Sequence, residues 1–159
     1  MILDVGCGMD PTGDVNCDLF LKDVGHRSVN KIFHLNPQAI PNFIKCDALH
    51  LPFKKSCFNE VRCEHVLAHV ESPERLILEL LRVSKFKVVV SAPHALGEFK
   101  YDVHIHNFRG RWFYQLAKKH GLAVKVTFVR WHNYPCEAIT FFRLPCEIKA
   151  VFYKEYRKK

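Results

Sequence analysis

The sequence predicts an α/β fold with a mostly parallel sheet and an antiparallel edge near the C-terminus. Three observations support this. Short apolar segments alternate with amphipathic ones through the first two thirds of the chain. The first apolar segment runs directly into a Gly-x-Gly turn at Gly6 and Gly8. The last third consists mainly of strand-like segments, which are typical of an antiparallel edge. The 159 residues contain no linker or repeat, so we expect one domain over 1–159.

The first half of the chain reads as four strands. They are predicted at 2–5, 14–20, 43–48 and 59–66. The connection between the first two, residues 9–13, is too short and too rich in helix breakers for a full helix. Residues 21–41 carry one glycine and two prolines, and they allow one short helix at most.

Two helices and four strands are predicted in the second half. Ser72 can cap the first helix, Pro73 suits its first turn, and an apolar stripe follows. The second helix is predicted over 109–120, where Gly121 ends it. The polar segment between the helices, residues 91–108, is predicted to be a lid. The strands are predicted at 86–90, 122–130, 137–143 and 147–153.

Composition and charge narrow the cellular context. The apolar fraction of 48% is typical of a globular chain, and no apolar run approaches the ~20 residues of a membrane span. The seven cysteines are an odd number without framework spacing, and no basic leader precedes the first strand. We therefore expect reduced thiols and a cytoplasmic location. The net charge of +8 makes RNA or another acidic partner plausible.

Polar or small residues stand where the first four predicted strands end. In an open α/β sheet, a ligand binds beyond the C-terminal ends of the strands. A carboxylate after the second strand can accept hydrogen bonds from ribose hydroxyls, and one after the third can accept from an exocyclic amine. The residues at these four ends are Gly6, Cys7 and Gly8, then Asp18, then Asp47, Ala48 and Leu49, and finally Glu64 and His65.

Residues 2–94 resemble a class I S-adenosylmethionine-dependent methyltransferase of the small methyltransferase-11 type. The resemblance rests on residues 2–8 (ILDVGCG), 14–20 (DVNCDLF) and 46–70 (CDALHLPFKKSCFNEVRCEHVLAHV). Residues 104–122 (HIHNFRGRWFYQLAKKHGL) also look like a segment of this family. The resemblance implies a Rossmann-like doubly wound fold, S-adenosyl-L-methionine as the cofactor, and methyl transfer to an acceptor that the sequence does not identify.

The resemblance also assigns roles to the residues at the strand ends. Gly6, Cys7 and Gly8 would pass under the methionine and ribose, and Asp4 would stabilise this loop or reach the methionine amine. Asp18 would hold the ribose hydroxyls. Asp47 would take the adenine amine, with the Ala48 and Leu49 backbone near the ring. Glu64 and His65 would line the methyl side. We take His65 as the first candidate catalytic residue and His94 as the second.

The sequence departs from the family pattern in ways that leave an alternative open. Ala68 replaces the usual glutamate, the third glycine of the turn is absent, and helices that roof the cofactor in relatives do not precede the first strand. The roof would then come from 91–108, from a second copy in a homodimer, or from a partner subunit. The alternative function is a catalytically weak or inactive methyltransferase-like binding subunit. Such a subunit could be associated with nucleic acid.

Two other site types are disfavoured by the sequence. A structural zinc site could use Cys57, Cys63, His65 and His69, but the chain contains no C-x-x-C motif. Cys136 and Cys146 each follow a proline, as in pyrimidine-C5 methyltransferases, but they come after the fifth predicted strand. We expect no metal in the site and no membrane partner.

Overall fold

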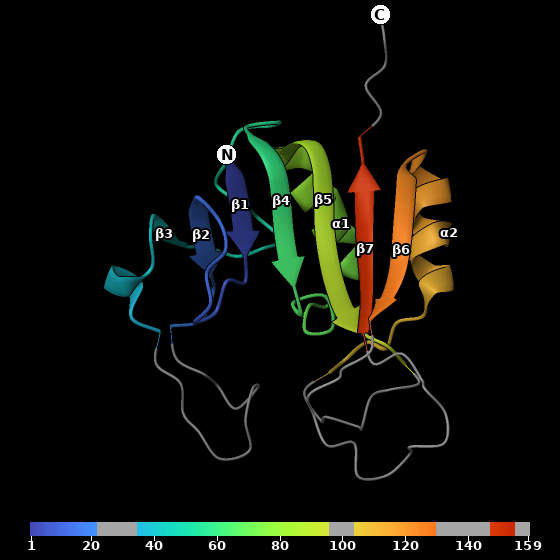
Figure 1. Ribbon diagram of the computed structural model, residues 1–159, viewed down its shortest axis with the longest axis horizontal. Helices are drawn as coiled ribbons and strands as arrows, with labels where there is room; N and C mark the ends of the chain where they lie inside the picture. The colour runs from blue at the N-terminus through green and yellow to red at the C-terminus, as the bar shows by residue number, and fades with distance from the viewer. Residues whose placement is uncertain (22–34, 96–103, 130–146, 155–159) are drawn as a thin grey trace, which may run out of the picture.

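A computed structural model describes residues 1–21, 35–95, 104–129 and 147–154 (Figure 1). Within these residues, seven strands form one sheet in the order β3-β2-β1-β4-β5-β7-β6. The strands are β1 (Ile2–Val5), β2 (Val15–Asp18), β3 (Phe43–Lys45), β4 (Phe58–Glu64), β5 (Ser84–Pro93), β6 (Ala123–Val129) and β7 (Glu147–Tyr153).

The sheet is parallel from β3 to β5 and antiparallel at β7 and β6. The chain starts at β1, adds β2 and β3 on one side, and then crosses to β4 and β5 on the other. The strand order therefore reverses between β1 and β4, which is the topological switch point where α/β sheets bind ligands. This arrangement confirms the predicted fold class.

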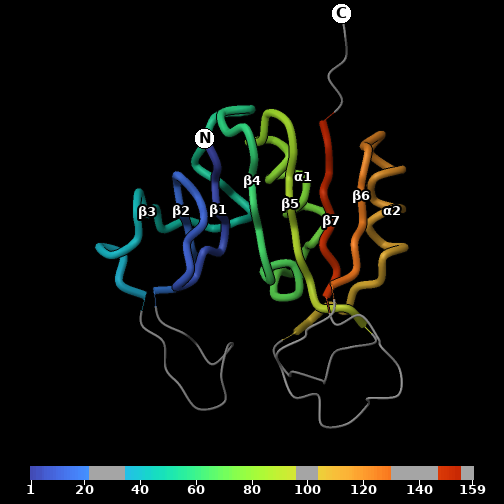
Figure 2. The backbone as a smooth tube through the Cα atoms, viewed as in Figure 1, coloured from blue at the N-terminus to red at the C-terminus, as the bar shows by residue number. Residues whose placement is uncertain are grey.

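Both α-helices of the described residues lie on the same face of the sheet, behind the strands in Figures 1 and 2. Helix α1 (Pro73–Val83) contacts β4 and β5, and α2 (Gly110–His120) contacts β6 and β7. The two helices meet where the Glu74 carboxylate binds the side chains of Lys119 and His120, each at 2.7 Å.

The main core lies between these helices and the sheet. Alternate strand residues point toward the helices because side chains alternate across a strand. The core contains Leu3, Val5, Val61, Cys63, Val88, Val90, Ile148 and Phe152 from the strands, and Leu76, Ile77, Leu80, Phe113 and Leu116 from the helices.

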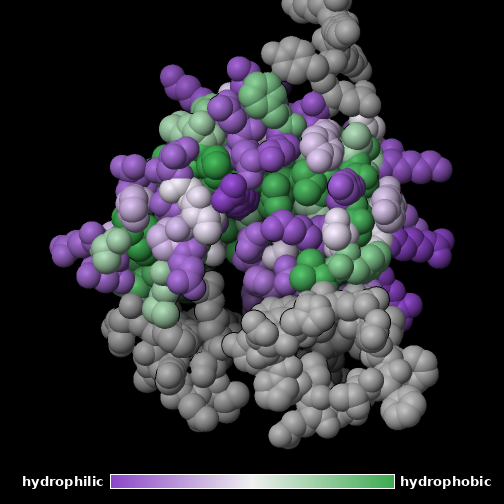
Figure 3. All heavy atoms as spheres, viewed as in Figure 1, coloured by the Kyte–Doolittle hydropathy of each residue, from purple (hydrophilic) through white to green (hydrophobic). Residues whose placement is uncertain are grey.

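The other face of the sheet, which faces the viewer in Figures 1 and 3, carries charged side chains over its central strands. Glu60 on β4 binds both Arg62 and Lys87 at 2.7 Å. Farther along β4, Glu64 binds Lys149 of β7 at 3.2 Å. The long stems of such lysine and arginine side chains can shield apolar groups, and Val89 between them is 7% exposed. This face therefore meets water without a covering helix among the described residues.

Helix ends agree with the sequence signals. Helix α1 begins after Ser72 with Pro73 in its first turn, although the Ser72 side chain makes no capping hydrogen bond. Helix α2 ends at Gly121, which adopts the left-handed conformation with φ 62° that glycine accommodates without strain. Residues 37–39 form a short 3-10 helix, η1 (Pro37–Ala39), capped by the side chain of Asn36.

Several predicted boundaries need correction. Strand β3 ends at Lys45 rather than at residue 48, because residues 47–50 form a turn. Strand β5 extends to Pro93, and Phe108 is buried in the core, so both ends of the predicted lid belong to the fold. The strand predicted at 137–143 lies outside the described residues, as do residues 96–103. Within the described part of the chain, no helix is long and apolar enough to cross a membrane.

Candidate functional site

Strands β1, β2, β3 and β4 end at one edge of the sheet, the lower edge in Figure 1, because they run parallel. The Gly-x-Gly turn forms the centre of this edge. Gly6 has φ 74° and Gly8 has φ 54°, a region that disfavours residues with a Cβ atom. A Cβ on Gly6 would also collide with the Val66 side chain. The turn therefore depends on glycine at position 6 for two separate reasons.

Asp18 ends β2 beside this turn. Its Oδ2 accepts the Gly8 backbone N–H at 3.0 Å, and its Oδ1 accepts the Phe20 N–H at 3.1 Å. The residue is only 8% exposed. Each carboxylate oxygen keeps one further lone pair after these bonds. The Asp18 carboxylate is thus fixed in place and can still accept two hydrogen bonds from a ligand.

Asp4 has its carboxylate turned toward the loop that follows the glycine turn. Its Oδ2 accepts both the backbone N–H and the hydroxyl of Thr12 at 2.9 Å. Cys7, between the two glycines, is buried, and its thiol lies 3.7 Å from the Gly8 carbonyl oxygen. Of the two roles expected for Asp4, stabilising the loop is the one for which the structure provides contacts.

Asp47 follows β3 and is held by a compact turn. Its Oδ1 accepts the Leu49 N–H at 2.8 Å, and its Oδ2 lies 3.1 Å from His50 Nδ1. The Leu49 hydrogen bond, together with His50, lowers the pKa of Asp47. The side chain is 44% exposed. The Leu49 backbone was expected to lie beside an adenine ring. Its N–H is already bound to Asp47, so this amide is not free to bind the adenine.

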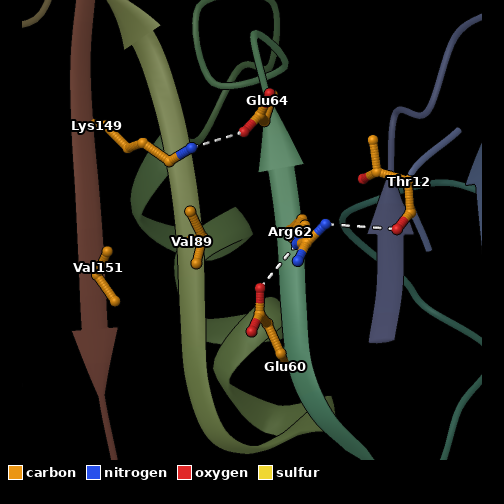
Figure 4. A pocket seen from close by; sticks show the side chains of 7 residues that line it. All are labelled: Thr12, Glu60, Arg62, Glu64, Val89, Lys149 and Val151. Carbon is orange, nitrogen blue, oxygen red and sulfur yellow. Dashed lines mark hydrogen bonds and ion pairs between the residues drawn. The ribbon is translucent and has the colours of Figure 1, made fainter. Parts of the chain in front are cut away.

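Glu64 and His65 end β4 on the far side of the switch point. His65 has φ 57°, which is uncommon for a non-glycine residue and is found most often at functional sites or turns. Its backbone N–H donates to the Ser91 carbonyl at 3.1 Å, and its Nε2 lies 3.9 Å from Glu147 Oε2. Glu64 extends toward Lys149 across β5 (Figure 4).

Ser91 lies between Glu64 and Lys149 in the strand register. Among the described residues it provides a buried side-chain oxygen, Oγ, that has no hydrogen-bond partner. A buried polar atom without a partner is destabilising and calls for an explanation. Ser91 was not predictable from the sequence, because no local signal marks a hydroxyl that will lack a partner.

His94 occupies a different environment. The residue is 6% exposed, and its ring lies 5.7 Å from the Phe128 ring on the helix-covered side. Burial, assisted by the positive charge of Arg109, lowers the pKa of His94. The structure therefore does not place His94 on the face that carries Glu64 and Lys149, and its packing favours a structural role.

The described residues also border a hollow on the open face of the sheet (Figure 4). It is lined by Thr12, Glu60, Arg62, Glu64, Val89, Lys149 and Val151. This hollow lies along the sheet rather than at the glycine turn, and its charged side chains already pair with one another. Within the described ranges, no group of three or more metal-ligating side chains occurs.

Comparison with known proteins decides the family. A family model described as a methyltransferase domain matches residues 3–90, which is more than half of the chain. The chain belongs to this methyltransferase family. Its cofactor is S-adenosylmethionine. A comparison with curated proteins gave no significant match.

Solved structures of methyltransferases share the fold at low sequence identity. An S-adenosylmethionine-dependent methyltransferase from Thermotoga maritima aligns with a TM-score of 0.68 at 15% identity, over 97% of this chain and 82% of that one. A structure of the Haloferax volcanii Trm112 methyltransferase activator in complex with a methyltransferase gives 0.68 at 11% identity, over 99% and 83%. Magnesium protoporphyrin IX methyltransferase from Synechocystis, with bound S-adenosylmethionine, gives 0.59 at 15%, over 98% and 70%.

Proposed function

We propose that this chain is an S-adenosylmethionine-dependent methyltransferase whose cofactor site lies at the ends of β1, β2, β3 and β4. The observation that carries the proposal is the Asp18 carboxylate, which two backbone amides fix beside the glycine turn. The switch point between β1 and β4 supports the same location.

The acceptors at this edge suit the donors of the cofactor. S-adenosylmethionine offers two ribose hydroxyls, an adenine amine and a methionine ammonium group. Asp18, Asp47 and Glu64 supply carboxylates at three successive strand ends, and each retains capacity to accept hydrogen bonds. Leu19 and Phe20, 42% and 50% exposed, add apolar surface next to Asp18. The residues present therefore fit the cofactor.

When bound, S-adenosylmethionine supplies an electrophilic methyl group on a sulfonium. The task of the chain is then to bind, to orient, and to accept a proton where the methyl acceptor carries one. Asp18 would fix the ribose, Asp47 the adenine, and the backbone of Gly6, Cys7 and Gly8 would pass beneath the cofactor. His65 would receive the proton, with the Glu147 carboxylate beside its Nε2.

Calorimetry with S-adenosylmethionine tests the proposal. We expect Asp18→Ala to weaken binding by roughly 10- to 100-fold, because a charged hydrogen-bond acceptor for the ribose is lost. Asp14→Ala is a matched control, since Asp14 is an exposed aspartate just before the first residue of β2, away from the end that carries Asp18. No heat of binding to wild-type protein at millimolar cofactor would falsify the proposed function.

The second candidate function is a methyltransferase-like binding subunit that works with a partner. It is favoured by the sheet face that no helix of the described residues covers, and by the similarity to a methyltransferase solved with its activator. Formation of S-adenosylhomocysteine, measured by mass spectrometry with RNA or small-molecule acceptors, separates the two functions. A protein that binds the cofactor but gives no product with any acceptor supports the binding subunit.

The basic residues in α2 and at its N-cap provide a test for a nucleic-acid acceptor. Arg109, Arg111 and Lys118 are exposed. Binding to phosphates releases counterions, so RNA affinity should fall steeply between 50 and 200 mM salt, by on the order of tenfold or more. Replacing Arg111 and Lys118 with glutamate should weaken this binding. Salt-independent or undetectable RNA binding would favour a small-molecule acceptor.

A further inference from the structure

A row of three contacting side chains, Asp47, His50 and Arg75, connects the turn after β3 to helix α1. His50 Nδ1 lies 3.1 Å from Asp47 Oδ2, and the Arg75 guanidinium contacts His50 Nε2 from the first turn of α1. We propose that His50 and Arg75 are positioning residues that orient the Asp47 carboxylate toward the amine of a 6-amino purine. They would thereby set the preference of the site for adenine over a 6-oxo purine. This inference rests on the proposed function.

The donors and acceptors of Asp47, His50 and Arg75 permit only one arrangement of their hydrogen bonds. A guanidinium has no acceptor atom, so His50 Nε2 must accept the hydrogen bond from Arg75. The imidazole is then neutral, with its proton on Nδ1, and this proton is donated to Asp47 Oδ2. Asp47 and Arg75 therefore require the same tautomer of His50, which donates from Nδ1 to Asp47 and accepts at Nε2 from Arg75.

The backbone holds the other carboxylate oxygen. The Leu49 N–H donates to Asp47 Oδ1 at 2.8 Å, while the His50 N–H donates to the Asp47 carbonyl at 3.0 Å. Both carboxylate oxygens are thus fixed by protein donors, and each keeps one lone pair for a ligand. The Leu49 and His50 contacts also lower the pKa of Asp47, so that its carboxylate stays an acceptor without a proton to donate.

Base preference follows from this acceptor-only state. A 6-amino purine presents a donor to the carboxylate, whereas a 6-oxo purine presents a second acceptor, which the carboxylate repels. A site whose polar groups would be left unpaired discriminates strongly against such an analogue. Asp47 and His50 are 44% and 62% exposed in their side chains. An isolated pair at this exposure would be held weakly. Arg75 is also exposed, but it comes from the first turn of α1 and adds a second contact to the pair.

The test compares binding of S-adenosylhomocysteine with binding of its 6-oxo analogue, S-inosylhomocysteine. Two substitutions at His50 form a matched pair. His50→Asn keeps an amide donor near the Nδ1 position, whereas His50→Gln places its amide near the Nε2 position and loses the Nδ1 donor. Circular dichroism and thermal unfolding establish that both variants are folded.

We expect wild-type protein to prefer the adenine ligand by roughly tenfold or more, and His50→Gln to lose most of this preference. His50→Asn should retain most of it. An unchanged ratio in folded His50→Gln overturns the positioning role, while wild-type protein that binds neither ligand overturns the proposed function instead.

A spectroscopic measurement on the free protein gives an independent readout. Long-range proton–nitrogen spectra of histidine-labelled protein should show His50 protonated on Nδ1. Arg75→Ala should leave Nδ1 protonated, because Asp47 still accepts from it, and should change the Nε2 signal, because Nε2 loses its donor, without unfolding the protein. A wild-type His50 protonated on Nε2 would overturn the inference, since that tautomer cannot accept from Arg75.

Discussion

The Gly8 backbone N–H donates to Asp18 Oδ2 at 3.0 Å, and this bond ties the turn after β1 to the end of β2. The Gly8 N–H and the Asp18 carboxylate would each be destabilising if they were buried without a partner, and here they satisfy each other. The position of Asp18 therefore depends on the glycine turn, and substitutions in the turn should affect binding through the carboxylate.

Two glycines with similar backbone angles should respond differently to alanine. Gly6 has φ 74° and a Cβ there would meet Val66, whereas Gly121 has φ 62° and open space around the added atom. Gly121→Ala should cost about 1 kcal/mol from backbone strain alone. Gly6→Ala should cost about 2–4 kcal/mol, because overpacking adds to the strain. Urea unfolding measures both, and equal losses would contradict the close packing of Val66.

Two buried serines offer a second matched pair. Ser91 Oγ has no hydrogen-bond partner, while Ser84 Oγ donates to the Lys87 carbonyl at 3.2 Å. Ser84→Ala should lose about 1 kcal/mol of stability, and Ser91→Ala should leave it unchanged or raise it by up to about 1 kcal/mol. The thermal midpoints of the two variants give the comparison. A large loss at Ser91 would mean that its hydroxyl is paired in solution.

The thiols of Cys17 and Cys46 should differ in reactivity. A hydrogen bond from the Cys17 thiol to Cys46 raises the pKa of Cys17 and lowers the pKa of Cys46. Thiolates are the reactive form, so iodoacetamide at pH 7.5 should label Cys46 before Cys17. Peptide mapping by mass spectrometry resolves the sites, with Cys57→Ser removing an exposed thiol from the background. Labelling of Cys17 first would contradict the direction of the hydrogen bond.

Glu79 should make the protein sensitive to acid. It binds Arg82 at 2.7 Å and accepts the Leu51 N–H at 2.8 Å, and the contact with Arg82 is the main reason that its pKa is lowered. A carboxyl group with a lowered pKa stabilises the folded state above its ordinary pKa of about 4.3, and this contribution is lost as the pH falls.

We therefore expect Glu79→Gln to lower the free energy of unfolding by about 1 kcal/mol at pH 7 and by less at pH 3. The value at pH 7 is reduced to allow for the partial exposure of Arg82. Denaturant unfolding at the two pH values measures this difference. Glu71→Gln, which alters an exposed glutamate, serves as the control. A loss of equal size at pH 3 would show that packing, and not charge, accounts for the effect.

The sequence predicted those features that depend on local signals. Strand β7 matches its predicted range, 147–153, because apolar residues alternate along it, and α2 ends where Gly121 allows a left-handed residue. The position of Asp18 at the end of β2 and that of Asp47 in the turn after β3 followed from the same alternation of strands and turns.

Features that depend on distant parts of the chain were not predictable in this way. Strand β5 continues to Pro93 because β7 pairs with it from Lys87 to Pro93, and the sequence around Ser91 contains no sign of this partner. The contact between His50 and Arg75 likewise joins a turn to a helix that comes later in the chain. Burial of His94 required knowledge of the Phe128 position.

The short connection between β1 and β2 has a consequence for the order of folding. Leu3 pairs with Val15 on one side and with the far more distant Val61 on the other. Closing the shorter loop costs less chain entropy, and local pairing generally forms faster. We expect the unit from Ile2 to Asp18, with Thr12 bound to Asp4, to gain protection early in pulse-labelling hydrogen exchange. The proposed ribose site would then be assembled on the ribosome or in refolding before most of the sheet exists.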